Sequence, residues 1–190
     1  MPNRTWTTWT GAAAAIVLAV APAADVAAAP QQEQNAAAVV TLRYDDSRAA
    51  GWEAAIAAGV ANWNASVSTV RLVEAAPGTT AEIQIVATTG WPQATLGPVR
   101  PGGRARVELG SQAVTDGHDK TRIAAHEIGH NLGLPDTKPG PCSQLMSGSS
   151  AGTSCRNAVP NATERARVAA FYAQSLARTP ADGRLLVDAP

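Results

Sequence analysis

The sequence predicts a single domain of the α/β class, built on a twisted, mixed β-sheet. Segments whose hydrophobic residues alternate, as in strands, are interleaved with segments whose hydrophobic residues recur every three or four positions, as in helices. The first elements occur in the order strand, helix, strand, strand, which is typical of sheets covered by helices. At 190 residues the chain is long enough for one domain with a sizeable core and requires no second one.

The N-terminal segment, residues 1–29, is predicted to be a secretory signal peptide. Arg4 precedes an apolar run from Gly11 to Ala21, and small residues follow in an A-x-A-like order. The run is shorter than the roughly 20 residues that a membrane-spanning helix needs, so we expect no membrane anchor. Residues 30–36 are interpreted as a short propeptide or an unstructured N-terminus.

The folded domain is predicted to span residues 37–180, followed by a tail, 181–190, that carries no clear signal. Its first part contains three predicted strands and one amphipathic helix, whose apolar side chains form a single stripe. In chain order these are a strand at Val39–Tyr44, a helix at Gly51–Ser66, and strands at Val70–Glu74 and Glu82–Ala87.

The middle of the domain begins with Gly90–Gly103, which is dense in Gly and Pro and predicts a long loop or an irregular sheet edge. Arg104–Leu109 is a predicted strand, after which the chain becomes polar over Gly110–Gly117. A helix is then expected over Thr121–Leu132, because Asp119 is a favourable N-cap residue.

A last helix is expected to close the domain. Asn161 and Glu164 have the spacing of a capping box, in which each side chain bonds to the other residue's backbone. The residues that follow place an apolar face on this helix, made by Val168, Phe171, Tyr172 and Leu176.

Charge and cysteine content narrow the class of protein. The formal net charge is zero and Lys and Arg do not cluster, so the sequence argues against a nucleic-acid partner. The only cysteines are Cys142 and Cys155, and an even number in an exported chain favours a disulfide over two buried free thiols.

Two candidate metal ligands and a candidate general base lie in the predicted helix over Thr121–Leu132. His126 and His130 are four residues apart, so their imidazoles face the same way and can share one small metal ion. Glu127 lies beside the first histidine, where a general base acting on a catalytic water is expected. The alternative is that both histidines lie on the surface of an ordinary helix.

The residues after this helix favour a metal site. Gly133 can take a positive φ, which ends the helix and reverses the chain, and Leu134 before Pro135 is pushed into extended geometry. Asp136 can then return to the metal as a third ligand, unless it is simply a turn residue. Zinc with three protein ligands keeps a fourth position open, which is typical of catalytic sites.

This arrangement resembles a known family. H-E-x-x-H-x-x-G-x-x-D followed by Met146 in a tight turn is similar to the metzincins, and among them to the snapalysin family of small secreted bacterial neutral proteases. The segment Gly140–Gly148, Cys155 and Asn161–Arg165 also match that family, and the resemblance runs from about Val39 to Leu176. It implies a metzincin-like domain, a Met-turn at Met146, and zinc held by the two histidines and the aspartate of the motif.

The resemblance also implies a calcium ion held by Asp119 and Thr121, which match a D-x-T-R segment of the family. The alternative is that Asp119 only caps the helix. The remaining histidine, His118, is interpreted as a loop residue, with a position along the cleft as the alternative.

One position departs from the family. Where snapalysins have His-Tyr directly after the third ligand, this chain has Thr137 and Lys138. Lys138 could donate to the oxyanion of the transition state in place of the tyrosine, but base rates for lysine favour a side chain that points into solvent.

Together these features predict a secreted bacterial zinc metalloendopeptidase that acts as a monomer on proteins or peptides, with a substrate strand laid along an exposed sheet edge. Similarity to snapalysins implies a preference for an aromatic residue just after the scissile bond. The alternative is a secreted zinc-binding module that binds peptides without cleaving them.

Overall fold

The computed structural model describes residues 39–173 and 185–188. These belong to the second of the two compact units into which the chain divides, Met1–Gln34 and Asn35–Pro190. The predicted signal peptide and the segment that follows it lie outside the described residues and stay predictions. No helix within the described ranges is long and apolar enough to cross a membrane.

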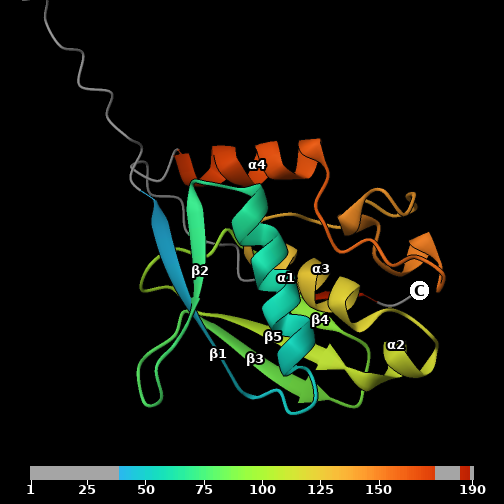
Figure 1. The fold of residues 1–190 in the computed structure, drawn as a ribbon, viewed down its shortest axis with the longest axis horizontal. Coiled ribbons are helices and arrows are strands. Elements are labelled where there is room, and N and C mark those ends of the chain that lie inside the picture. Colours follow the sequence, from blue (N-terminus) through green and yellow to red (C-terminus); the bar gives the residue numbers. More distant parts are fainter. Residues whose placement is uncertain (1–38, 174–184, 189–190) are drawn as a thin grey trace, which may run out of the picture. The chain divides into compact units, whose positions relative to one another are not determined.

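A mixed sheet forms the centre of the domain, which confirms the predicted α/β class (Figure 1). Its six strands are arranged in the order β2-β1-β3-β5-β4-β6. The first four in this order are parallel to one another, whereas β4 and β6 run antiparallel to their neighbours. The strands are β1 (Val40–Arg48), β2 (Val70–Glu74), β3 (Ile83–Thr88), β4 (Gln93–Thr95), β5 (Ala105–Gly110) and β6 (Leu185–Val187).

Two helices that lie side by side in Figure 1, α1 and α3, supply much of the core. Gly59 of α1 allows this close approach, because a Cβ there would lie 3.0 Å from the backbone nitrogen of Ala125. Trp63 also donates its indole N–H to the Ala125 carbonyl at 2.8 Å. The helices are α1 (Glu53–Ser66), α2 (Ser111–Thr115), α3 (Lys120–Asn131) and α4 (Ala162–Ala173), with a 3-10 segment, η1 (Leu145–Ala151).

Most predicted elements are confirmed to within a residue or two, with the following exceptions. β1 runs on to Arg48, beyond its predicted end at Tyr44. The expected loop or edge at 90–103 contains β4, and the polar segment at 110–117, for which no element was predicted, contains α2. The tail read as lacking a signal contains β6, which pairs with β4.

The short strand β4 is fixed to the end of α3. The Asn131 side chain donates to the Thr95 carbonyl at 2.7 Å, and the Gly97 amide donates to the His130 carbonyl at 2.8 Å. Gly97 is required here, because a Cβ would lie 1.9 Å from the Asn131 carbonyl oxygen. These contacts place β4 beside the helix that carries the predicted site.

Candidate metal centre

Helix α3 positions the two histidines and the glutamate of the motif. Asp119 begins the helix as predicted, accepting the Arg122 amide at 2.9 Å. His126, Glu127 and His130 are all buried, at most 1% exposed. The two imidazole rings have centroids 4.6 Å apart and are nearly perpendicular, so they converge as the four-residue spacing predicts.

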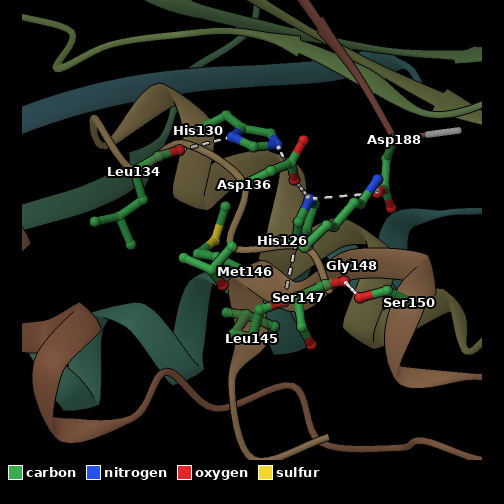
Figure 2. Close-up of polar contacts among 12 residues, drawn as sticks. His126, His130, Leu134, Asp136, Leu145, Met146, Ser147, Gly148, Ser150 and Asp188 are labelled. Carbon is green, nitrogen blue, oxygen red and sulfur yellow. Dashed lines mark hydrogen bonds and ion pairs between the residues drawn. The ribbon is translucent and has the colours of Figure 1, made fainter. Parts of the chain in front are cut away.

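Each imidazole is oriented by a backbone carbonyl. The Nδ1 atom of His126 lies 3.0 Å from the Leu145 carbonyl oxygen, and that of His130 lies 2.7 Å from the Leu134 carbonyl oxygen. Donation from Nδ1–H leaves the Nε2 lone pair available for a metal ion. Figure 2 shows both rings pointing toward Asp136.

The chain reversal after α3 follows from Gly133. Its φ is +103°, its amide donates to the His130 carbonyl at 2.9 Å, and the Leu134 amide donates to Gly129 at 3.1 Å. This is the Schellman arrangement, which a glycine adopts without steric cost. The reversal carries Asp136 back over the helix.

Asp136 completes a group of three candidate ligands. Its Oδ1 atom lies 3.3 Å from His126 Nε2 and 3.6 Å from His130 Nε2. These three atoms are buried and have no hydrogen-bond partner among the described residues. Such atoms are costly unless something satisfies them, so the donor set fits a divalent cation that accepts nitrogen and carboxylate oxygen.

The electrostatics of the site also favour a cation. Burial and the neighbouring His126 lower the pKa of His130 to about 4, so its imidazole is neutral, the form that binds a metal. Burial lowers the pKa of His126, but the Asp188 and Asp136 carboxylates more than offset this and raise it to about 9. The carboxylates therefore create a strongly negative local potential.

Glu127 is completely buried beside the candidate ligands. Its two carboxylate oxygens have no hydrogen-bond partner within the described residues. Burial raises its pKa well above the usual range, with the His126 charge acting in the opposite direction. A buried carboxyl group whose pKa is raised in this way is a candidate general acid and base.

The turn around Met146 forms the floor of the site. Met146 is 1% exposed and packs against Gly129, where a Cβ would lie 2.7 Å from the methionine Sδ. The Glu164 carboxylate accepts the amides of Leu145 at 3.2 Å and Met146 at 2.8 Å. Glu164 also makes the predicted capping box with Asn161, so the start of α4 and this turn share one carboxylate.

Arg122 holds the same turn from α3. Its buried guanidinium donates to the Ser147 hydroxyl at 2.9 Å and to the Gln144 carbonyl at 3.0 Å. The predicted disulfide between Cys142 and Cys155 is present, with the Cα atoms 5.5 Å apart. The roles of Arg122 and Glu164 in fixing the turn were not predicted, because both depend on contacts between distant segments.

Asp188 and Lys138 also meet at the site; the sequence offered a role there for Lys138 as an alternative, and none for Asp188. Asp188, directly after β6, is 5% exposed, and its Oδ1 lies 3.8 Å from His126 Nε2. Lys138 forms an ion pair with the same carboxylate. The expectation that Lys138 points into solvent is therefore wrong: its partner comes from a segment far along the chain.

The remaining predicted residues lie at the edge of the site. Asp119 and His118 line a small cavity together with His126 and Asp188, and a position of His118 along the substrate cleft stays a prediction. In the described part of the chain, the groups that could hold a metal ion contain neither Asp119 nor Thr121. Asp119 acts as a helix cap, and calcium stays a prediction.

The chain matches the Streptomyces extracellular neutral proteinase (M7) family over residues 39–175. It is 41% identical to the extracellular small neutral protease of Streptomyces coelicolor over 145 residues, 76% of this chain and 65% of that protein. It is 40% identical to the extracellular small neutral protease of Streptomyces caespitosus over 156 residues, 70% of this chain and 98% of that protein. The chain thus spans slightly less than two thirds of the first relative and nearly all of the second.

Among solved structures the chain is similar to high choriolytic enzyme 1, a hatching enzyme zinc-protease from Oryzias latipes. The TM-score is 0.38 and the identity 25%, over 52% of this chain and 46% of that one. The family match itself covers more than half of this chain and includes the motif on α3. This chain therefore belongs to the Streptomyces extracellular neutral proteinase (M7) family.

Proposed function

We propose that this chain is a secreted zinc metalloendopeptidase whose metal is held by His126, His130 and Asp136. The observation that carries the proposal is the convergence of three buried ligand atoms, two imidazole Nε2 and one carboxylate Oδ1, at which zinc would satisfy otherwise unpaired groups. Extracellular proteases at about 40% identity support both the reaction class and the location outside the cell.

The chain's own residues divide the work of peptide hydrolysis. A zinc ion bound here would polarise the scissile carbonyl and make the attacking water more acidic. Glu127 accepts the proton of that water and delivers it to the leaving amine, as its burial and raised pKa allow. The carbonyls of Leu145 and Leu134 keep the two imidazoles in the orientation that ligation requires.

Metal analysis combined with a casein digest tests the proposal. Secreted protein should contain about one zinc per chain and should cleave casein, and a zinc chelator should abolish cleavage. His130→Ala should lose zinc, while His118→Ala, a matched change outside the ligand set, should keep it. Cleavage that survives complete zinc removal would contradict the assignment.

Two finer features belong to the same proposal. Similarity to snapalysins implies an aromatic residue just after the scissile bond, which mass spectrometry of casein fragments would reveal. The alternative, a zinc-binding module that holds peptides without turnover, predicts zinc and peptide binding but no fragments. Intact Glu127 in a buried site favours turnover.

A further inference from the structure

The strand β6 lies on β4 in the manner of a bound peptide. Val187 pairs with Gln93, Leu186 with Ala94 and Leu185 with Thr95, in antiparallel register. The pairing continues past the strand, where the Asp188 amide donates to the Pro92 carbonyl at 2.8 Å. Peptides often bind proteins in this way, by adding a strand to a sheet edge.

Two of the three β6 side chains contribute little to its attachment. Leu185 and Val187 are 47% and 50% exposed, so they bury only part of their apolar surface. Leu186 between them is partly buried, and Asp188, directly after the strand, is only 5% exposed. The segment is therefore held by main-chain pairing, by the partly buried Leu186 and by one buried carboxylate.

The Asp188 carboxylate has a fitted place beside the candidate metal ligands. Its ligand oxygen, a Glu127 oxygen and a His126 nitrogen all lie within 4.8 Å of one another. Gly148 leaves room for it, because a Cβ there would lie 2.3 Å from Asp188 Oδ1. Lys138 pairs with the same carboxylate and so compensates part of its charge. Figure 2 shows Asp188 approaching His126 from the side opposite Met146.

We propose that β6 occupies in cis the place along β4 that a substrate strand takes, and that Asp188 supplies a further ligand to the metal. The inference rests on the proposed function, because it assumes a metal held by His126, His130 and Asp136. Zinc sites with three protein ligands keep a fourth position for water or substrate, and a carboxylate oxygen can fill it. The segment lies beyond the family match, which ends at residue 175.

Such an arrangement makes the chain its own inhibitor. Because the strand is tethered, it competes with substrate at an effective concentration on the order of millimolar. A three-residue strand with two half-exposed side chains can detach without loss of the core. Substrate binding then requires release of the strand, and the apparent affinity for substrate falls with the fraction of chains that are free.

The decisive experiment measures binding without turnover. All proteins carry Glu127→Ala and are loaded with zinc, and the probe is a fluorescein-labelled peptide with the sequence of residues 181–190 of this chain. Fluorescence anisotropy gives its Kd for chains that also carry Asp188→Ala or Leu186→Pro. Asp182→Ala is the control, because it removes an identical side chain from the same region of the sequence.

If the strand is bound in nine chains of ten, freeing it should tighten probe binding by about tenfold. We expect this gain for Asp188→Ala and for Leu186→Pro, which disrupts strand pairing without touching the carboxylate. Asp182→Ala should bind as weakly as the parent. If neither variant binds the probe more tightly than this control, the proposal is wrong.

A second measurement separates this inference from the proposed function. With Glu127 intact, Asp188→Ala should raise kcat/KM on casein, mainly through a lower KM. Casein cleavage that is unchanged in Asp188→Ala and Leu186→Pro would overturn the inference and leave the peptidase assignment standing. Tighter probe binding without casein cleavage in any variant would support the inference and count against the peptidase.

Discussion

Two segments reach the candidate metal ligands, and they are attached in very different ways. The turn around Met146 is buried, and Glu164, Arg122 and a disulfide hold it from three directions. The strand β6 is half-exposed and contributes one buried residue, Asp188. The turn around Met146, which we call the floor, is therefore a fixed part of the site. The segment made of β6 and Asp188, which we call the cover, is attached weakly enough to be released.

The two segments differ because buried hydrogen bonds hold the first and main-chain pairing at a sheet edge holds the second. Buried hydrogen bonds from a charged group to several acceptors are lost together, so their removal is costly. Main-chain pairing on a sheet edge exchanges readily with water or with another strand. Substitutions in the floor should therefore lower the free energy of unfolding, and substitutions in the cover should mainly change activity.

The largest effect is expected for Arg122→Met. The change removes a buried guanidinium that donates to the Ser147 hydroxyl and to the Gln144 and Asn157 carbonyls, so the free energy of unfolding should fall by at least about 3 kcal/mol. Chemical denaturation measures it, with Arg71→Met on the exposed face of β2 as control. Equal midpoints for the two variants would show that Arg122 is not needed to hold the floor.

Replacing Glu127 with Gln should act on catalysis alone. General-base work contributes at least about 100-fold, so kcat on casein should fall by that factor while zinc content and the melting temperature stay near those of the parent. Glu74→Gln, an exposed carboxylate on β2, is the matched control. Near-normal kcat in Glu127→Gln would remove the proposed mechanism.

Removal of the disulfide should loosen the floor by a smaller amount. Replacing Cys142 and Cys155 together with Ser frees a loop with a sequence separation of 13, for which chain entropy predicts about 2 to 3 kcal/mol. Thermal unfolding with and without reductant measures this. The parent should lose stability on reduction and the double variant should not, and a parent that is insensitive to reductant would contradict the expectation.

The floor and the metal-binding helix could be predicted because their signals are local. The spacing of His126 and His130 fixes their relative direction on any helix, and Gly133 encodes the reversal within a few residues. The capping pair Asn161 and Glu164 is local in the same sense. Each prediction needed only the geometry of one turn of helix.

The position of β6 and Asp188 could not be predicted, because nothing in the sequence of this segment indicates that it pairs with β4. β6 has only three residues, and its pairing with β4 joins the end of the domain to a strand far back in its sequence. β4 itself is hidden among the Gly and Pro residues that predicted a loop. The position of Asp188 follows only from this pairing, and the misplaced expectation for Lys138 has the same origin.

The last and smallest effect concerns Lys138, which links the two regions. It follows the candidate ligand Asp136 by two residues and forms an ion pair with Asp188 of the cover. Lys138→Met removes this attachment, and a partly exposed ion pair contributes up to about 1 kcal/mol, so kcat/KM on casein should rise two- to fivefold. If Lys138 instead donated to the oxyanion of the transition state, Lys138→Met would lower both kcat and kcat/KM.

Steady-state kinetics therefore separates the two roles of Lys138. Lys120→Met, at an exposed lysine at the start of α3, is the control and should change neither constant. The gain in kcat/KM from Lys138→Met should disappear in a protein that already carries Asp188→Ala. Such a result would assign the effect to the ion pair, because Lys138 then has no Asp188 carboxylate to hold in place.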